Sequence, residues 1–268
     1  MRKKGLVSCS KKIENKMITY PIFKEFPDIY AFTTTKKQGL HALSRFTGEE
    51  VSLVQHSKDQ LSRELGIDPS NLVFPRQTHS SNVKLLESLP EHEITDTDAL
   101  ITSKPGICIC VQTADCVPLI IYDPKHHAAA VIHAGWRGTY SEIAGITVKA
   151  MSKEFKSSPS KLVAVIGPSI GSGFYEIGNE VADLFIGKYG DWKDLIINSE
   201  FQRPHLDLWE LNRLQLLRVG LHQSSISLYG KCTYENHDLF YSARREGVET
   251  GRMATGIILK HRNMNTIF

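Results

Sequence analysis

Short apolar runs bounded by turn residues dominate the middle of the chain, and this pattern predicts a core of β-strands. The turn cluster 123–127 separates two of the runs, which are therefore expected to pair as an antiparallel hairpin. Cys116 precedes the outgoing strand and His133 closes the returning one, so the two side chains are predicted to lie at the same end. The expected strands cover residues 29–34, 99–102, 107–113, 118–122 and 128–133.

Helical patterns follow in the second half of the chain. Thr139 and Glu142 stand three residues apart, as in a capping box, and predict a helix that extends to about residue 155. Apolar spacing predicts further helices over 178–189 and 206–222. Because strand-rich and helical stretches do not alternate regularly, we expect an α+β fold in which mixed, mainly antiparallel sheets form a central core with flanking helices.

The length and composition of the chain are typical of a globular protein with a buried core. The 268 residues are 41% hydrophobic and contain no Pro, Gly or Ser-rich linker, which predicts a single domain over 1–268. The net charge of +3 is spread over scattered residues, which does not favour nucleic acid as a partner. No apolar run is long enough for a membrane span or a signal peptide, so a cytoplasmic protein is expected. The five cysteines lack the paired spacing of a disulfide framework.

Three polar segments carry the candidate chemistry, at 75–79, 112–116 and 133–138. They contribute His79, Cys116 and His133. Two imidazoles and a thiolate form a donor set that suits Zn²⁺, and three protein ligands leave one coordination position for water. An open position indicates a catalytic site rather than a structural one.

Each candidate also has a structural interpretation. A thiol at a strand start is often a buried core residue, and an isolated histidine is often solvated or capped. Cys108 and Cys110 alternate with apolar residues in a predicted strand and are interpreted as core residues. His126 and His127 lie in the predicted turn and are assigned no metal.

The ordered motifs Q-x-H at 77–79, T-A-D-C-x-P at 113–118 and H-A-G-W-R-G at 133–138 resemble the YfiH family. The human member of this family is the laccase-domain protein, and the family is also called multicopper polyphenol oxidase. The similarity covers roughly residues 29–259, so residues 1–16 are interpreted as a flexible extension. The resemblance implies a purine nucleoside enzyme that phosphorolyses adenosine, inosine or methylthioadenosine and also deaminates adenosine. Its expected partners are therefore the small molecules purine nucleoside and phosphate.

Roles for individual residues follow from their positions beside the proposed ligands, together with this resemblance. Asp115 and Cys116 are the catalytic candidates, with Asp115 either an acid/base or a residue that orients a metal ligand. An arginine fork suits bidentate recognition of phosphate, although a surface ion pair is the ordinary role of such a side chain. The helix predicted after His133 would present its N-terminus to the site and favour an anion. The candidates for substrate and phosphate binding are Arg76, Gln77, Arg137 and Arg244.

Other functions remain open at this point. A copper polyphenol oxidase would bind Cu²⁺ in place of zinc, but the sequence lacks the H-x-H pairs expected of a multicopper cluster. A cysteine hydrolase that edits peptidoglycan precursors would use Cys116 as its nucleophile. A non-enzymatic interaction module is the third alternative. Metal content distinguishes the first two from a zinc enzyme, and the oligomeric state is not predicted.

Overall fold

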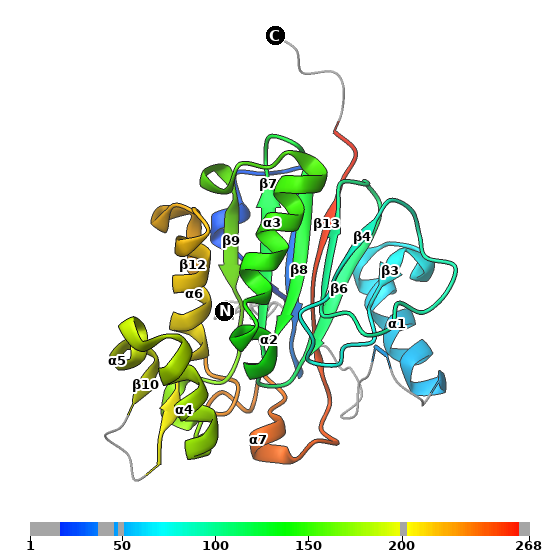
Figure 1. Ribbon diagram of the computed structural model, residues 1–268. Helices are drawn as coiled ribbons and strands as arrows, with labels where there is room; N and C mark the ends of the chain where they lie inside the picture. The colour runs from blue at the N-terminus through cyan, green and yellow to red at the C-terminus, as the bar shows by residue number, and fades with distance from the viewer. Residues whose placement is uncertain (1–16, 37–45, 48–50, 199–202, 263–268) are drawn as a thin grey trace, which may run out of the picture.

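A six-stranded mixed sheet forms one layer of the protein (Figure 1). The computed structural model describes residues 17–36, 46–47, 51–198 and 203–262. The strand order is β12-β9-β7-β8-β5-β4, with parallel pairs at the two edges and antiparallel pairs between them. The strands are β4 (Val83–Leu86), β5 (Ala99–Thr102), β7 (Val117–Asp123), β8 (Ala128–Ala134), β9 (Val163–Ile166) and β12 (Ile226–Leu228).

A five-stranded sheet packs against the first, in the order β1-β2-β13-β6-β3. Only the pair β3–β6 in this sheet is parallel. Its strands are β1 (Met17–Thr19), β2 (Ile29–Thr34), β3 (Leu72–Val73), β6 (Cys108–Thr113) and β13 (Met253–Leu259). A separate two-stranded ribbon pairs β10 (Ile197–Asn198) with β11 (His205–Leu206).

The central core lies between the two large sheets. Alternate residues of each strand point into it, as the two-residue period of a strand requires. Ile109 and Ile257 of the five-stranded sheet are buried in one cluster with Leu100, Ile120 and Val131 of the six-stranded sheet. This shared core fixes the ends of β6, β7 and β8 relative to one another. The polar segment 112–116 lies where β6 ends and β7 begins, and the segment 133–138 starts at the end of β8.

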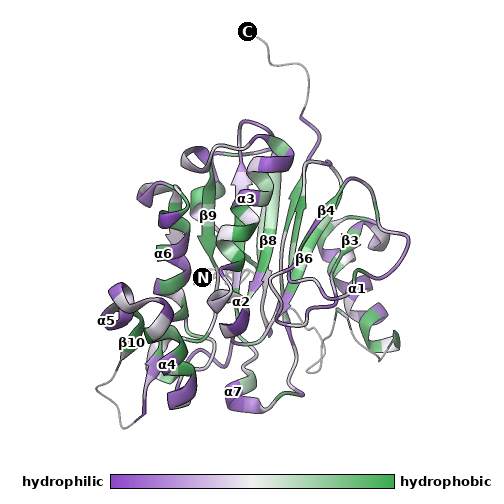
Figure 2. Ribbon diagram, viewed as in Figure 1, coloured by the Kyte–Doolittle hydropathy of each residue, from purple (hydrophilic) through white to green (hydrophobic). Residues whose placement is uncertain are grey.

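Helices cover the outer face of each sheet (Figure 1). Leu119 and Ile132 contribute to a second cluster with Val148 and Leu211 from helices on that side, whereas Leu61 of α1 packs over the five-stranded sheet. Figure 2 shows the strands as mainly hydrophobic and the helices as polar on part of their surface. The helices are α1 (Val51–Leu65), α2 (Trp136–Tyr140), α3 (Ile143–Phe155), α4 (Asn179–Lys188), α5 (Lys193–Ile196), α6 (Leu208–Arg218) and α7 (Ala243–Glu246).

Single 3-10 turns connect many of these elements. They cover Pro21–Phe23, Pro69–Asn71, Pro159–Lys161, Ser172–Phe174, Gly190–Trp192 and Gln223–Ser225. Within the described ranges, no helix is both long and apolar enough to cross a membrane.

The predicted α+β class and the five expected strands are confirmed, with shifts of one residue at some ends. The expected hairpin is β7–β8, in which Pro118 pairs with His133. Cys116, two residues before Pro118, therefore lies at the same end as His133. Residues 1–16, interpreted above as an extension, lie outside the described residues.

The capping box predicted at Thr139 and Glu142 is wrong. The chain forms two helices, because Glu142 has a left-handed backbone (φ 64°) and separates α2 from α3. Its carboxylate does not cap a helix but lies 3.3 Å from Arg218 and 3.6 Å from Lys188. The hydroxyl of Thr139 lies inside α2 and accepts a hydrogen bond from Asn212. The predicted end of the second helix at Phe155 is correct.

The helix predicted over 206–222 is shorter at both ends. Asp207 accepts a hydrogen bond from the backbone N–H of Glu210, which is the geometry of an N-cap and starts α6 at Leu208. The preceding residues 205–206 belong to β11 instead. The helix predicted over 178–189 is confirmed as α4.

Candidate metal centre

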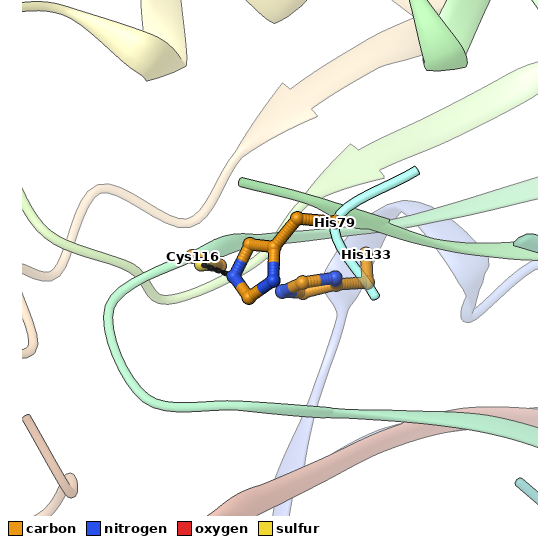
Figure 3. A group of neighbouring side chains, drawn as sticks. All are labelled: His79, Cys116 and His133. Atoms are coloured by element: carbon orange, nitrogen blue, oxygen red, sulfur yellow. Dashed lines mark hydrogen bonds between the residues drawn. The ribbon is translucent and has the colours of Figure 1, made fainter. Parts of the chain in front are cut away.

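Three side chains from separate segments meet at one end of the sheets, as Figure 3 shows. Cys116 precedes β7, His133 lies in β8, and His79 lies in the loop between β3 and β4. Their donor atoms all lie within 4.8 Å of one another, with 3.7 Å between Cys116 Sγ and His79 Nε2. The structure thus brings together the three residues that the sequence selected as ligands.

Gly135 leaves the space in which these donors meet. A Cβ atom at this position would lie 2.7 Å from Cδ2 of His79 and 3.1 Å from Sγ of Cys116. The first distance is shorter than any ordinary carbon contact, so a larger residue would displace the His79 ring. Glycine at position 135 is therefore a requirement of the site itself rather than of backbone conformation.

Asp98 positions two of the three donors, and the sequence analysis missed it. Its buried carboxylate lies 2.6 Å from Nδ1 of His133. It also accepts hydrogen bonds from the backbone N–H groups of Thr78, His79 and Ser80, at 2.7–3.1 Å. The left-handed backbone of His79 (φ 62°) turns these amides toward one carboxylate. With Nδ1 occupied by Asp98, the Nε2 atom of His133 is the one available to a metal.

The electrostatics of the site favour a bound cation. Burial raises the pKa of Asp98, but hydrogen bonds from His133 and Ser80 outweigh it and lower the pKa to about 2. Burial likewise raises the pKa of the Cys116 thiol, whereas the charge on His133 and hydrogen bonds from both histidines lower it to about 6. Burial lowers the pKa of His133, but Cys116 and Asp98 raise it to about 9. A thiolate and a carboxylate are thus both stabilised next to the rings.

The donor set fits a zinc ion. A thiolate and two imidazoles at this separation match the ligands that zinc prefers. Asp98 supplies the hydrogen bond to the second ring nitrogen that metal-binding histidines usually have. In the described part of the chain, this trio is the only group of three or more His, Cys, Asp or Glu residues close enough to hold a metal.

Asp115 lies beside Cys116, and both of its carboxylate oxygens accept hydrogen bonds. It accepts hydrogen bonds from the hydroxyls of Thr233 (2.6 Å) and Ser242 (3.0 Å) and from the backbone N–H of Arg244 (2.7 Å). Its backbone is left-handed (φ 87°), a costly conformation for a residue with a side chain. These bonds hold the segment before Cys116 against the start of α7.

Tyr175 and Arg244 form one side of the site's surroundings. The Arg244 guanidinium donates 2.9 Å to the carbonyl of Glu176 and lies 5.3 Å from the centre of the Tyr175 ring. Burial raises the pKa of Tyr175, and the charges of Cys116 and Asp115 raise it further while those of Arg244 and Arg137 lower it. The hydroxyl of Tyr175 is therefore within electrostatic range of the proposed ligand Cys116. No role was predicted for Tyr175 from the sequence.

Arg137 is an exposed residue among the predicted anion-binding candidates. Its guanidinium stacks 4.1 Å from the centre of the neighbouring Trp136 ring. Among the described residues it has neither an ion pair nor a side-chain hydrogen bond. It follows Gly135, and therefore the metal donors, by only two positions in the chain.

The other two predicted substrate residues contact protein groups. The Gln77 amide donates to the backbone carbonyl of Gln112 (2.9 Å) and accepts from its N–H (2.8 Å). This pair ties the His79 loop to β6. The Arg76 guanidinium lies 3.7 Å from the carboxylate of Glu93.

The residues that were interpreted as structural are placed accordingly. Cys108 and Cys110 are fully buried beneath α1, with 3.6 Å between their sulfur atoms. His126 contacts Asp123 in the β7–β8 turn, and His127 lies 3.0 Å from the hydroxyl of Tyr122.

Comparisons with known proteins place the chain in a family. A purine nucleoside phosphorylase from Bacteroides thetaiotaomicron is 37% identical over 262 residues, covering 92% of this chain and 97% of that protein. The adenosine deaminase RL5, from an unknown prokaryotic organism, is 35% identical, covering 88% of this chain and 96% of that protein. The crystal structure of the hypothetical protein YfiH from Bacillus licheniformis has a TM-score of 0.82 at 29% identity, covering 91% of this chain and 97% of that one.

The solved structure of YlmD from Geobacillus stearothermophilus has the same TM-score at 27% identity, covering 92% of this chain and 97% of that one. Both structures confirm the α+β fold. The sequence model for the family described as multi-copper polyphenol oxidoreductase laccase matches residues 32–260, nearly the whole described chain. The resemblance to the YfiH family that the motifs at 77–79, 113–118 and 133–138 indicated is thus confirmed. The chain belongs to the multi-copper polyphenol oxidoreductase laccase family.

Proposed function

We propose that this protein is a zinc-dependent purine nucleoside enzyme. It cleaves adenosine, inosine or methylthioadenosine with phosphate to the free base and the sugar 1-phosphate, and it deaminates adenosine. The observation that carries the proposal is the convergence of His79, Cys116 and His133 around the space kept by Gly135. The names of the relatives, purine nucleoside phosphorylase and adenosine deaminase, support the substrate class.

His79, Cys116 and His133 would hold the zinc ion, which when bound supplies a Lewis acid that activates water or polarises the substrate. The remaining chemistry belongs to the chain. Asp98 keeps a proton on Nδ1 of His133 and fixes the His79 loop through three backbone amides. Both donors are therefore held in place before a substrate arrives, which is what preorganisation requires.

Arg137 is the proposed phosphate-binding residue. Phosphorolysis needs a dianion placed against the anomeric carbon, where an oxygen of phosphate forms the new bond as the bond from the sugar to the base breaks. The Arg137 guanidinium has no carboxylate partner among the described residues, so binding phosphate does not require breaking an ion pair. Stacking on Trp136 limits the directions in which its fork can point.

Tyr175 and Arg244 are proposed to shape the substrate side of the site. A tyrosine hydroxyl is ordinarily protonated at neutral pH, and the raised pKa of Tyr175 keeps it so, which lets it donate a hydrogen bond to the nucleoside. Arg244 holds the segment that carries Tyr175 through the carbonyl of Glu176. We assign Gln77 to positioning, because both ends of its amide bind Gln112.

Asp115 is proposed to position Cys116 rather than to transfer a proton. Both of its carboxylate oxygens already accept hydrogen bonds, from Thr233 on one side and from Ser242 and Arg244 on the other. Three accepted hydrogen bonds stabilise the carboxylate and leave it little capacity to take a substrate proton, as a general base must. These hydrogen bonds favour the second role predicted for Asp115, that of a residue that orients a metal ligand.

Two other functions are less well supported. A multicopper oxidase needs additional metal sites, and the described residues offer a single three-donor group. A cysteine hydrolase needs a thiolate free to attack, and a metal bound to Cys116 would occupy its electron pair. The low pKa of Cys116 does suit a nucleophile, so metal content decides between the two readings.

The deciding experiment incubates purified protein with adenosine, inosine and methylthioadenosine, with and without phosphate, and separates the products by chromatography. We expect free base only when phosphate is present, and conversion of adenosine to inosine in both conditions. Base release that is independent of phosphate would make the protein a hydrolase. If none of the three nucleosides is consumed by zinc-loaded protein, the proposed function is wrong.

A further inference from the structure

A cavity of about 550 Å³ lies on the outer side of the five-stranded sheet, between α1 and residues 90–94. This volume is within the range of roughly 300–1,000 Å³ typical of small-molecule sites. None of the three metal donors lines it, so it is separate from the candidate metal centre. The residues that matter for its chemistry are Phe46, Thr47, Lys58, Phe74, Glu93 and Ile94.

An aromatic pair and a cation give this cavity a specific character. The rings of Phe46 and Phe74 stack with their centres 4.7 Å apart and only 11° between their planes. The ammonium of Lys58 lies 5.9 Å from the centre of the Phe74 ring. Both rings are buried, with 0% of Phe46 and 5% of Phe74 exposed, so the surface that the cavity offers to a ligand consists of the Lys58 ammonium and of apolar side chains that are not buried. These include Val54, Pro69 and Pro90.

The charge on Lys58 is not neutralised by a neighbour. Burial lowers the pKa of its ammonium, while electrostatic interactions with Cys110 and Glu93 raise it. Lys58 makes no ion pair with any residue in the described ranges, and Glu93, the acidic residue of the opposite wall, lies against Arg76. A half-buried cation that faces a cavity without a carboxylate partner is most stable when a ligand supplies the anion.

We propose that this cavity binds a small organic anion that has an apolar body. The apolar body packs against Val54, Pro69 and Pro90, and the anionic group binds the ammonium of Lys58. Nothing in this proposal depends on the reaction at the metal centre.

Hydrogen bonds link both walls of the cavity to the loop that carries His79. On one wall, the backbone N–H of Arg76 donates to the carbonyl of Ile94 at 2.7 Å. On the other, the Gln112 side chain accepts from the backbone N–H of Phe46 (2.9 Å) and donates to the hydroxyl of Thr47 (2.7 Å).

Gln112 in turn exchanges two backbone hydrogen bonds with the amide of Gln77. Arg76 is therefore bonded directly to one cavity wall, its neighbour Gln77 is linked to the other wall through Gln112, and His79 follows two positions later. A ligand that orders both walls should also restrain residues 75–79.

The test uses two dyes of nearly the same shape. 8-Anilino-1-naphthalenesulfonate carries one anionic group, and N-phenyl-1-naphthylamine is its uncharged analogue. Fluorescence titration of the full chain should give a saturable site that binds the anionic dye at least about tenfold more tightly, because a charge-assisted contact contributes about that factor. Lys58→Met, which keeps the apolar stem, should reduce this preference to about twofold or less.

Lys149→Met is the matched control, since Lys149 is exposed on α3, on the other face of the molecule. It should retain the preference of the wild type. Equal anion preference in wild type and Lys58→Met would overturn the proposed site, provided that both unfold at similar temperatures. Hydrogen exchange tests the link: the anionic dye should slow exchange in peptides covering 75–79. Unchanged exchange in dye-saturated protein would refute the coupling.

Discussion

Asp98 Oδ1 lies 2.6 Å from Nδ1 of His133, and the other carboxylate oxygen of Asp98 accepts the backbone N–H and hydroxyl of Ser80 at 2.7 Å. One buried side chain therefore joins β8 to the loop that carries His79. The relationship explains how two imidazoles from distant segments are held at a common point. It also makes Asp98 the residue whose loss should affect the metal centre most without removing a ligand.

Asp98→Asn is expected to weaken zinc binding about tenfold to a hundredfold, the usual effect of losing the outer partner of a metal-binding histidine. The amide keeps the shape of the carboxylate but removes its charge and places a donor against other donors. Competition with a chromophoric chelator measures the affinity. Asp183→Asn, at an exposed position of α4, should bind zinc as the wild type does. Equal affinities for Asp98→Asn and wild type would contradict the assigned role.

Gly135→Ala should lower the zinc content of purified protein to well below one ion per chain. The new methyl group would lie 2.7 Å from the His79 ring, so the ring must move away from Cys116. Elemental analysis of the purified variant checks this. In Gly187→Ala, a Cβ within α4 meets no atom within 4 Å, and that variant should keep its metal and gain roughly 0.5–1 kcal/mol of stability. Full zinc occupancy in Gly135→Ala would show that zinc still binds when the His79 ring is displaced from Cys116, and would contradict the requirement for glycine at position 135.

Cys116→Ala should bind zinc at least about a hundredfold more weakly, because a two-histidine site lacks the charged ligand that holds the ion. Cys108→Ala is the control, since Cys108 is buried under α1 and contacts Cys110 rather than the metal centre. Wild-type protein prepared with zinc and copper both available should contain about one zinc per chain. Stoichiometric copper in that preparation would favour the oxidase alternative.

The sequence predicted the β7–β8 hairpin because its two strands are close together in the chain. Residues 118–122 and 128–133 are continuous apolar runs separated by a five-residue turn, and local pattern is enough to pair them. The capping box failed for the opposite reason. Thr139 and Glu142 have the right spacing, but Asn212 binds one and Arg218 the other, and both partners lie more than seventy residues away.

The same limit applies to the site. His79, Cys116 and His133 could be selected because donor chemistry is visible in single residues. Asp98 has no such pattern: its role depends on hydrogen bonds to residues 18 and 35 positions away. Its place directly before the buried strand β5 was the one available signal. That the chain forms one domain, and that it is cytoplasmic, stay predictions.

Arg137→Met should separate the two proposed reactions. Loss of a charge-assisted contact to phosphate is expected to reduce the kcat/KM of phosphorolysis for phosphate about tenfold to a hundredfold, which corresponds to roughly 1.5–3 kcal/mol. Deamination needs water rather than phosphate and should change by less than about threefold. Both rates are measured on the same zinc-loaded preparation with adenosine as the substrate.

Arg63→Met provides the control, because Arg63 is exposed on α1 and makes no ion pair within the described ranges. It should leave both reactions unchanged. A parallel loss of phosphorolysis and deamination in Arg137→Met would mean that this arginine stabilises the site as a whole. Unchanged phosphorolysis would instead move the phosphate site toward Arg244, whose guanidinium is already engaged by the carbonyl of Glu176 and would have to exchange that contact for phosphate.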